Sequence, residues 1–252
     1  MIPEWEVATM LLTKQEPTIL GLEPGPSESS PHWAPLYRIG GLAAAAAAAI
    51  TPITIAVFTM WPPPYNEPAA EWFTFLRDNP LLGLMSLDLG FVVVTALIIP
   101  LMAALTVALY RVKPAMVFLA GVLFFVGVAT FFGNNPSIER LSLSNRYINA
   151  HTTAERLALT GAGEGLLASF DGTAFHVNYI LGQIAGIVLG FVMLGTALFS
   201  RRIAYLMIAG NAIGFGLYLP VVGLAISAFS GLILWVWMVM VARRLLQLSH
   251  VT

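Results

Sequence analysis

The fold is decided by residues 81–110, which read LLGLMSLDLGFVVVTALIIPLMAALTVALY. Asp88 is the only charged residue in this stretch. A hydrocarbon layer about 30 Å thick is crossed by about 20 apolar residues in a helix, which satisfies its own backbone hydrogen bonds. The stretch therefore predicts a transmembrane helix. Its length of 30 residues predicts a tilt or an extension beyond the lipid, and Pro100 predicts a kink.

Five further apolar stretches extend this prediction to an all-α polytopic membrane protein, a six-helix transmembrane bundle. The six spans are predicted at residues 39–60, 81–110, 114–132, 178–199, 203–219 and 221–241. They lie in a membrane domain of residues 38–245, and residues 246–252 form a cytoplasmic C-terminal tail. Residues 1–37 are expected to form a cytoplasmic, largely disordered tail, because residues 23–31 are rich in Pro, Ser and Glu.

The composition excludes several classes of protein. The chain is 58% hydrophobic and only 10% charged, whereas a soluble domain is about 25% charged. A net charge of -1 gives no basic field for nucleic acid. The absence of cysteine excludes disulfides, thiolate metal sites and a cysteine nucleophile. We expect no cofactor, and the lipid bilayer is the first expected partner.

Basic residues predict the orientation. If six helices alternate in direction, the basic residues beside the spans all fall on one side of the membrane. They are Arg38, Arg111, Lys113, Arg201, Arg202, Arg243 and Arg244. Basic residues in short loops mark the cytoplasmic side. We therefore expect both termini in the cytoplasm and the protein in the plasma membrane.

The connection between spans three and four, residues 133–175, predicts an extracytoplasmic helical cap. Its 43 residues are too many for a structureless loop in a compact protein. One helix is expected from Ser137 to Tyr147. A second is expected to begin with a capping box formed by Thr152 and Glu155. These helices either cover the bundle or lie in the membrane interface.

Asp88 is the first candidate functional residue, because ionisable groups inside a span are costly and usually face the bundle interior. It is a candidate proton carrier, cation ligand or general base. The alternative is a structural carboxyl that is neutral or hydrogen-bonded to a neighbouring helix.

Span four carries a second polar group, in which His176, Tyr179 and Gln183 share one helical face. The alternative to a functional role is hydrogen bonding between helices. Small residues repeat every four positions along spans four and five and predict close helix packing, at Gly182, Gly186, Gly190, Gly210 and Gly214. Asn211, near mid-membrane, is expected to hydrogen-bond between helices.

Depth in the membrane suggests one outward-facing polar pocket beneath the cap. Asp88, His176, Tyr179 and Gln183 all fall in the outer half of the bilayer, and Glu164 can reach down from the cap. A metal site from His151, Glu155 and His176 is not predicted, because a helix starting at Thr152 leaves His151 off the shared face.

Several short motifs resemble a prokaryotic family of six-span integral membrane proteins that is catalogued only as a domain of unknown function. They include Asn134-Asn135-Pro136, Arg146-Tyr147, Thr152, Arg156, Ala162-Gly163-Glu164, Gly172-Thr173-Ala174-Phe175 and the glycine repeat of span four. The resemblance covers residues 79–245. It implies a six-helix bundle with a recurring outer element and brings no activity with it.

Three classes of function remain open on the sequence alone. The first is a non-enzymatic accessory subunit, or a sensor that binds a small or lipidic ligand, working with other membrane subunits or as a homo-oligomer. The second is a small-solute or proton-coupled transporter that uses Asp88. The third is a membrane enzyme that uses Asp88, His176 and Glu164 on a lipid-like substrate.

Overall fold

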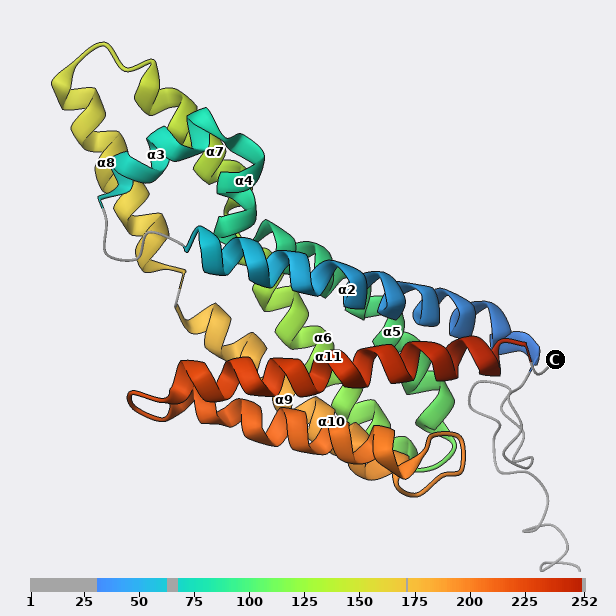
Figure 1. The fold of residues 1–252 in the computed structure, drawn as a ribbon. Helices are drawn as coiled ribbons and strands as arrows, with labels where there is room; N and C mark the ends of the chain where they lie inside the picture. Colours follow the sequence, from blue (N-terminus) through green and yellow to red (C-terminus); the bar gives the residue numbers. More distant parts are fainter. Residues whose placement is uncertain (1–30, 63–67, 171, 251–252) are drawn as a thin grey trace, which may run out of the picture.

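A computed structural model describes residues 31–62, 68–170 and 172–250, and this part of the chain is helical without strands (Figure 1). Five helical stretches are long and apolar enough to cross a membrane: Ala34–Met60, Pro80–Tyr110, Pro114–Ile148, Thr153–Met193 and Gly223–Leu248. By length and composition, the chain is a helical, multi-pass membrane protein.

Two groups of helices make up the molecule. A long bundle contains α2 (Ala34–Met60), α5 (Gly90–Tyr110), α6 (Pro114–Gly133), α9 (Thr173–Met193), α10 (Arg201–Gly214) and α11 (Gly223–Leu248). Four short helices, here termed the end cluster, gather at one end of it: α3 (Ala69–Asp78), α4 (Pro80–Leu84), α7 (Ser137–Ile148) and α8 (Thr153–Ala168) (Figure 1). Short 3-10 helices precede α2, as η1 (Pro31–Trp33), and follow α10, as η3 (Phe215–Tyr218).

Small residues bring the bundle helices close together. Ala44 and Ala47 on α2 are fully buried, and a Cβ added at Gly40 would lie 2.6 Å from the side chain of Ala104 on α5. On its other side α2 contacts α11, where Trp235 Nε1 donates to the Ala48 carbonyl at 2.8 Å. The alanine run near the start of α2 is thus a packing surface for two neighbours.

The second predicted span is interrupted at Asp88 rather than at Pro100. A π-helical segment, η2 (Met85–Leu89), separates α4 from α5, and inside it Asp88 has a φ of 75°. By contrast, α5 continues through Pro100. The Leu87 carbonyl at this interruption accepts a hydrogen bond from outside the helix. Its donor is Nη1 of Arg140 on α7, at 3.1 Å.

Several other boundaries differ from the predicted ones. Helix α2 begins at Ala34 rather than residue 39, with Pro35 in its first turn. The predicted tail, 1–37, lies mostly outside the described residues. Helix α9 covers 173–193 instead of 178–199, because the chain turns at Gly195 and Thr196, whose amides each donate to the carbonyl three residues earlier.

The fifth predicted span, 203–219, is the least regular. Helix α10 has 14 residues, about 21 Å at 1.5 Å per residue, so it is shorter than the five long helical stretches. It packs between α9 and α11, and Ser230 Oγ of α11 donates to the Gly210 carbonyl at 2.9 Å.

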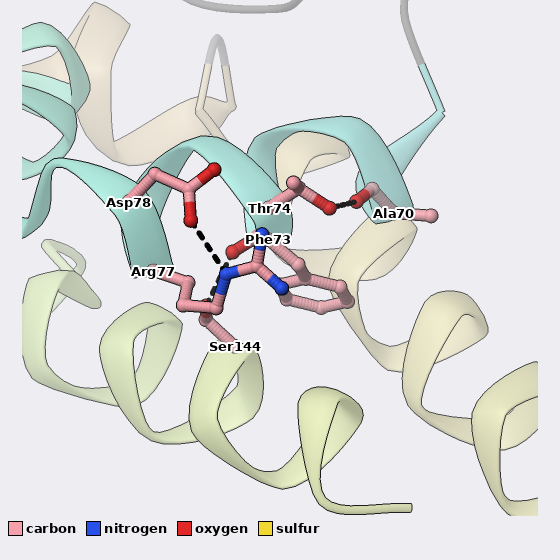
Figure 2. A network of polar contacts seen from close by, with 6 residues as sticks. All are labelled: Ala70, Phe73, Thr74, Arg77, Asp78 and Ser144. Atoms are coloured by element: carbon pink, nitrogen blue, oxygen red, sulfur yellow. Dashed lines mark hydrogen bonds and ion pairs between the residues drawn. The ribbon is translucent and has the colours of Figure 1, made fainter.

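The end cluster has its own apolar core. Trp72, Phe73 and Leu76 of α3 are buried together with Leu87 of η2. Figure 2 shows α3 lying over α7, where Ser144 Oγ donates to the Phe73 carbonyl at 2.6 Å. The helices between spans three and four thus pack with the connection between spans one and two.

The predicted start of α8 is present with one change. Thr152 is the N-cap and its hydroxyl accepts from the Glu155 amide at 3.1 Å. The Glu155 carboxylate accepts from the His151 amide rather than from the Thr152 amide. At the start of α4, Asn79 is the N-cap residue and its side chain makes no capping hydrogen bond.

Candidate functional site

A small polar pocket lies where the end cluster meets the bundle. It is lined by Asp88, Phe131, Asn134, Asn135, Arg140, Phe170, Ala174 and Phe175. These residues come from η2, the end of α6, the α6–α7 connection, α7, and the α8–α9 junction. Both parts of the molecule therefore contribute to its walls. The pocket has room for about one or two water molecules.

Asp88 enters the pocket from the helix interruption. Its φ of 75° and ψ of -1° place it in the left-handed region, which side chains other than glycine rarely adopt. Asp and Asn tolerate this region better than other residues, because their short polar side chains bond locally. At Asp88 the backbone therefore departs from the regular helical path.

Arg140 supplies the opposite charge. Its side chain is almost fully buried, with 1% of the residue exposed. Besides its bond to Leu87, the guanidinium lies 5.1 Å from the centre of the Phe170 ring. A buried cation is costly unless acceptors and opposite charge surround it. Asp88 lines the same pocket and brings an acidic side chain to it.

The sequence did not single out Arg140 as a candidate site residue. A signal for its burial is present in α7, where Ser137, Arg140 and Ser144 recur at three and four residues and are all buried. Two small serines flanking an arginine on one face leave room for a neighbouring helix. The motifs that carry the family resemblance also supply pocket residues, namely Asn134, Asn135, Ala174 and Phe175.

The polar face of α9 points toward α10 and α11 rather than into this pocket. His176 Nδ1 lies 3.1 Å from the Tyr218 hydroxyl. The Tyr179 hydroxyl donates to the Gly214 carbonyl at 2.8 Å and lies 3.0 Å from Ser227 Oγ. This arrangement matches the structural alternative, hydrogen bonding between helices.

Gln183 continues this polar face deeper into the bundle. It is 7% exposed and its amide packs directly against Gly214. Its Oε1 atom is buried without a hydrogen-bond partner. Asn211 of α10 packs against Gly186, on the next turn of α9. Its side chain donates to the Met207 carbonyl of its own helix at 2.7 Å. Asn211 therefore packs across the interface while hydrogen-bonding within α10.

The glycines predicted to mark close helix packing differ in their surroundings. A Cβ added at Gly190 would meet Ile208, and one at Gly210 would meet Leu234. A Cβ added at Gly186 would overlap the side chain of Asn211 on α10, and one added at Gly214 would overlap that of Gln183 on α9. A Cβ at Gly182 would have no heavy atom within 4 Å, so this glycine is not at a close approach.

Glu164 has a separate, structural position. Its Oε1 accepts from the Ala69 amide at 2.7 Å, which ties α8 to the first turn of α3. The predicted site residues therefore occupy three places: Asp88 the pocket, Glu164 the end cluster, and His176, Tyr179 and Gln183 the interface of α9 with α10 and α11. Within the described residues, no three His, Asp or Glu side chains gather as a metal site.

Comparisons with known proteins found no relative of this chain. No family model matches the chain, and no curated protein or solved structure gives a significant match. The resemblance to an uncharacterised family stays a prediction, and the function is argued from the geometry.

Proposed function

We propose that this is a six-span protein of the plasma membrane with the end cluster outside and both termini in the cytoplasm. In addition to the five long helical stretches, the fifth predicted span, 203–219, is formed by α10 continued by η3. Fourteen α-helical and four 3-10 residues reach about 29 Å at 1.5 and 2.0 Å per residue, close to the hydrocarbon thickness.

Charge supports this orientation. The end of the bundle opposite the end cluster, here termed the basic end, carries Arg38, Arg111, Lys113, Arg201, Arg202, Arg243 and Arg244. Every one lies at or near the end of a bundle helix, where the positive-inside rule applies.

For function, we propose a non-enzymatic membrane protein that binds a small polar ligand in the pocket of Asp88 and Arg140, as a sensor or accessory subunit. The observation that carries this proposal is the pairing of opposite charges with two amides and three phenyl rings in one pocket. Such a lining offers donors and acceptors to a polar group and apolar walls around it.

The position of the pocket suggests how a ligand acts. Its walls come from the bundle and from the end cluster, and Arg140 ties α7 to the interrupted helix by its bond to Leu87. A ligand larger than a water molecule needs these parts to move relative to one another. Binding would then shift the arrangement of the end cluster, which is how an accessory subunit or sensor reports occupancy.

The enzyme hypothesis loses its main support. It required Asp88, His176 and Glu164 to act on one substrate. His176 is instead beside Tyr218 and Glu164 beside Ala69, and neither lines the pocket that contains Asp88.

Transport is the second candidate, and the helix interruption favours it. Broken membrane helices expose backbone carbonyls and place side chains at ion and substrate sites in many transporters. Asp88 stands at such a break. Transport predicts a flux in reconstituted vesicles that Asp88→Asn abolishes, whereas ligand binding alone predicts no flux.

The binding proposal is tested by thermal unfolding of the detergent-solubilised protein with a panel of small amino acids, amines, carboxylates and inorganic cations. We expect at least one compound to raise the Tm of the wild type and to leave Asp88→Asn and Arg140→Gln unchanged. Glu164→Gln is the matched control, because it removes a charge from the end cluster outside the pocket. No stabilising compound, or equal shifts in all variants, would contradict the proposal.

A further inference from the structure

Charge is strongly segregated along the molecule. All the described acidic side chains lie in η2 and the end cluster: Glu71, Asp78, Asp88, Glu139, Glu155 and Glu164. The basic end holds seven arginines and lysines, and no Asp or Glu of the described residues stands among them. The basic end therefore carries a local positive charge that the described part of the chain does not neutralise.

Four arginines form the densest part of this end. Arg201 and Arg202 open α10, and Arg243 and Arg244 lie in the last turns of α11. Because α10 and α11 pack as an antiparallel hairpin (Figure 1), the start of one helix lies beside the end of the other. The four arginines thus lie at one corner of the bundle.

Their side chains are available to a partner. Arg201, Arg202 and Arg243 are exposed. Arg244 is half-buried, and its Nε donates to the Leu198 carbonyl in the α9–α10 connection at 2.5 Å. An ion pair forms between Arg77 and Asp78 of α3, in the end cluster and far from this corner. The Arg244 bond fixes the corner while the other three guanidinium groups face outward.

The chemistry of this corner fits a phosphodiester. Guanidinium groups bind phosphate oxygens with two parallel hydrogen bonds. Clusters of basic residues immediately beside membrane helices recognise anionic lipid headgroups. Apolar side chains of the same helices, including Leu232 and Val236 of α11, are exposed along the bundle and can contact acyl chains.

We propose that the basic end binds anionic phospholipid through its phosphodiester group, with Arg201, Arg202 and Arg243 as the contacts and Arg244 as a positioning residue. A lipid is favoured over a free phosphate because the arginines lie at the ends of apolar, exposed helices. This inference does not depend on the pocket of Asp88 and Arg140.

The test is native mass spectrometry of delipidated protein titrated with phosphatidylglycerol or with phosphatidylcholine. We expect phosphatidylglycerol to bind preferentially. The double variant Arg201→Gln/Arg202→Gln should weaken that binding by about fivefold for each arginine removed. The control is Arg146→Gln/Arg156→Gln, which removes the same charge from exposed positions of the end cluster and should leave binding unchanged.

Two further arms keep the proposal falsifiable. Arg201→Lys/Arg202→Lys retains the charge, so it should bind better than the Gln pair while folding as the wild type does. Inorganic phosphate at millimolar concentration should not displace the lipid. The proposal is overturned by equal binding of the two lipids, by equal losses in the control pair, or by displacement with free phosphate.

Discussion

Adding one methyl group to α9 should have opposite effects at two glycines that are one helical turn apart. At Gly186 a Cβ would lie within 3.0 Å of the Asn211 amide group. Asn211 is 8% exposed and donates to the Met207 carbonyl, so its side chain has no free direction to move. At Gly182 a Cβ would have no heavy atom within 4 Å.

The size of the difference follows from these surroundings. Overpacking a well-packed interior costs about 1–3 kcal/mol. Replacing Gly by Ala in a helix contributes about 1 kcal/mol of intrinsic propensity. The propensity gain is common to both variants, so it cancels when they are compared. Gly182→Ala should be about 1–3 kcal/mol more stable than Gly186→Ala.

Unfolding in detergent micelles, followed by tryptophan fluorescence or circular dichroism, measures this difference. About 2–4 °C of Tm is expected for each kcal/mol in a chain of this size. Removing the opposing side chain, in Gly186→Ala/Asn211→Ala, should recover part of the loss, since the two residues are in contact. Equal stabilities of the two alanine variants, or no recovery in the double variant, would refute this packing of α9 on α10.

Three further predictions address the pocket and the end cluster. Asp88→Gly should be about 1 kcal/mol more stable than Asp88→Ala, because only glycine adopts a positive φ freely. Chemical unfolding measures this difference, and a more stable alanine variant would argue against the left-handed turn. Glu164→Ala should speed hydrogen exchange at the Ala69 amide, measured by mass spectrometry, and leave α11 unchanged. The hydrogen bond from Arg77 lowers the pKa of Asp78, so Arg77→Gln should raise that pKa in an NMR titration. Any stability from this pair is present above the ordinary carboxyl pKa and lost as pH falls through the lowered value, and exposure makes it too small to move the Tm.

Sequence alone predicts the helices well wherever apolar length decides the structure. The predicted third span, 114–132, differs from α6 by one residue. The predicted helix from Ser137 to Tyr147 likewise ends one residue before α7 does. These elements depend on local signals, namely Pro at a helix start, an apolar run, and small polar residues at the ends.

The helix break at Asp88 was not predicted, for a reason that lies outside the local sequence. Pro100 removes one backbone donor, and α5 accommodates this loss without interruption. The break at Asp88 depends on Arg140, which is 52 residues further along the chain and satisfies the Leu87 carbonyl. No local pattern near Asp88 indicates that partner.

The candidate site was predicted only in part, because depth in a membrane does not specify which helix faces which. The depths of Asp88 and His176 gave no information about their neighbours. His176 faces Tyr218 on η3, while Asp88 meets the α7 side of the molecule. Arg140 was missed because its contacts, the Leu87 carbonyl of η2 and the Phe170 ring after α8, come from parts of the chain that are distant in sequence.

The most direct test of the central claim is native mass spectrometry of the protein extracted gently from its own membrane. Wild type and Asp88→Asn would be compared, with Glu164→Gln as the control. We expect a small non-lipid mass to be retained by the wild type and the control and lost from Asp88→Asn. A wild type that retains no such mass, or an Asp88→Asn variant that retains it equally, would contradict the assignment of the pocket as a ligand site.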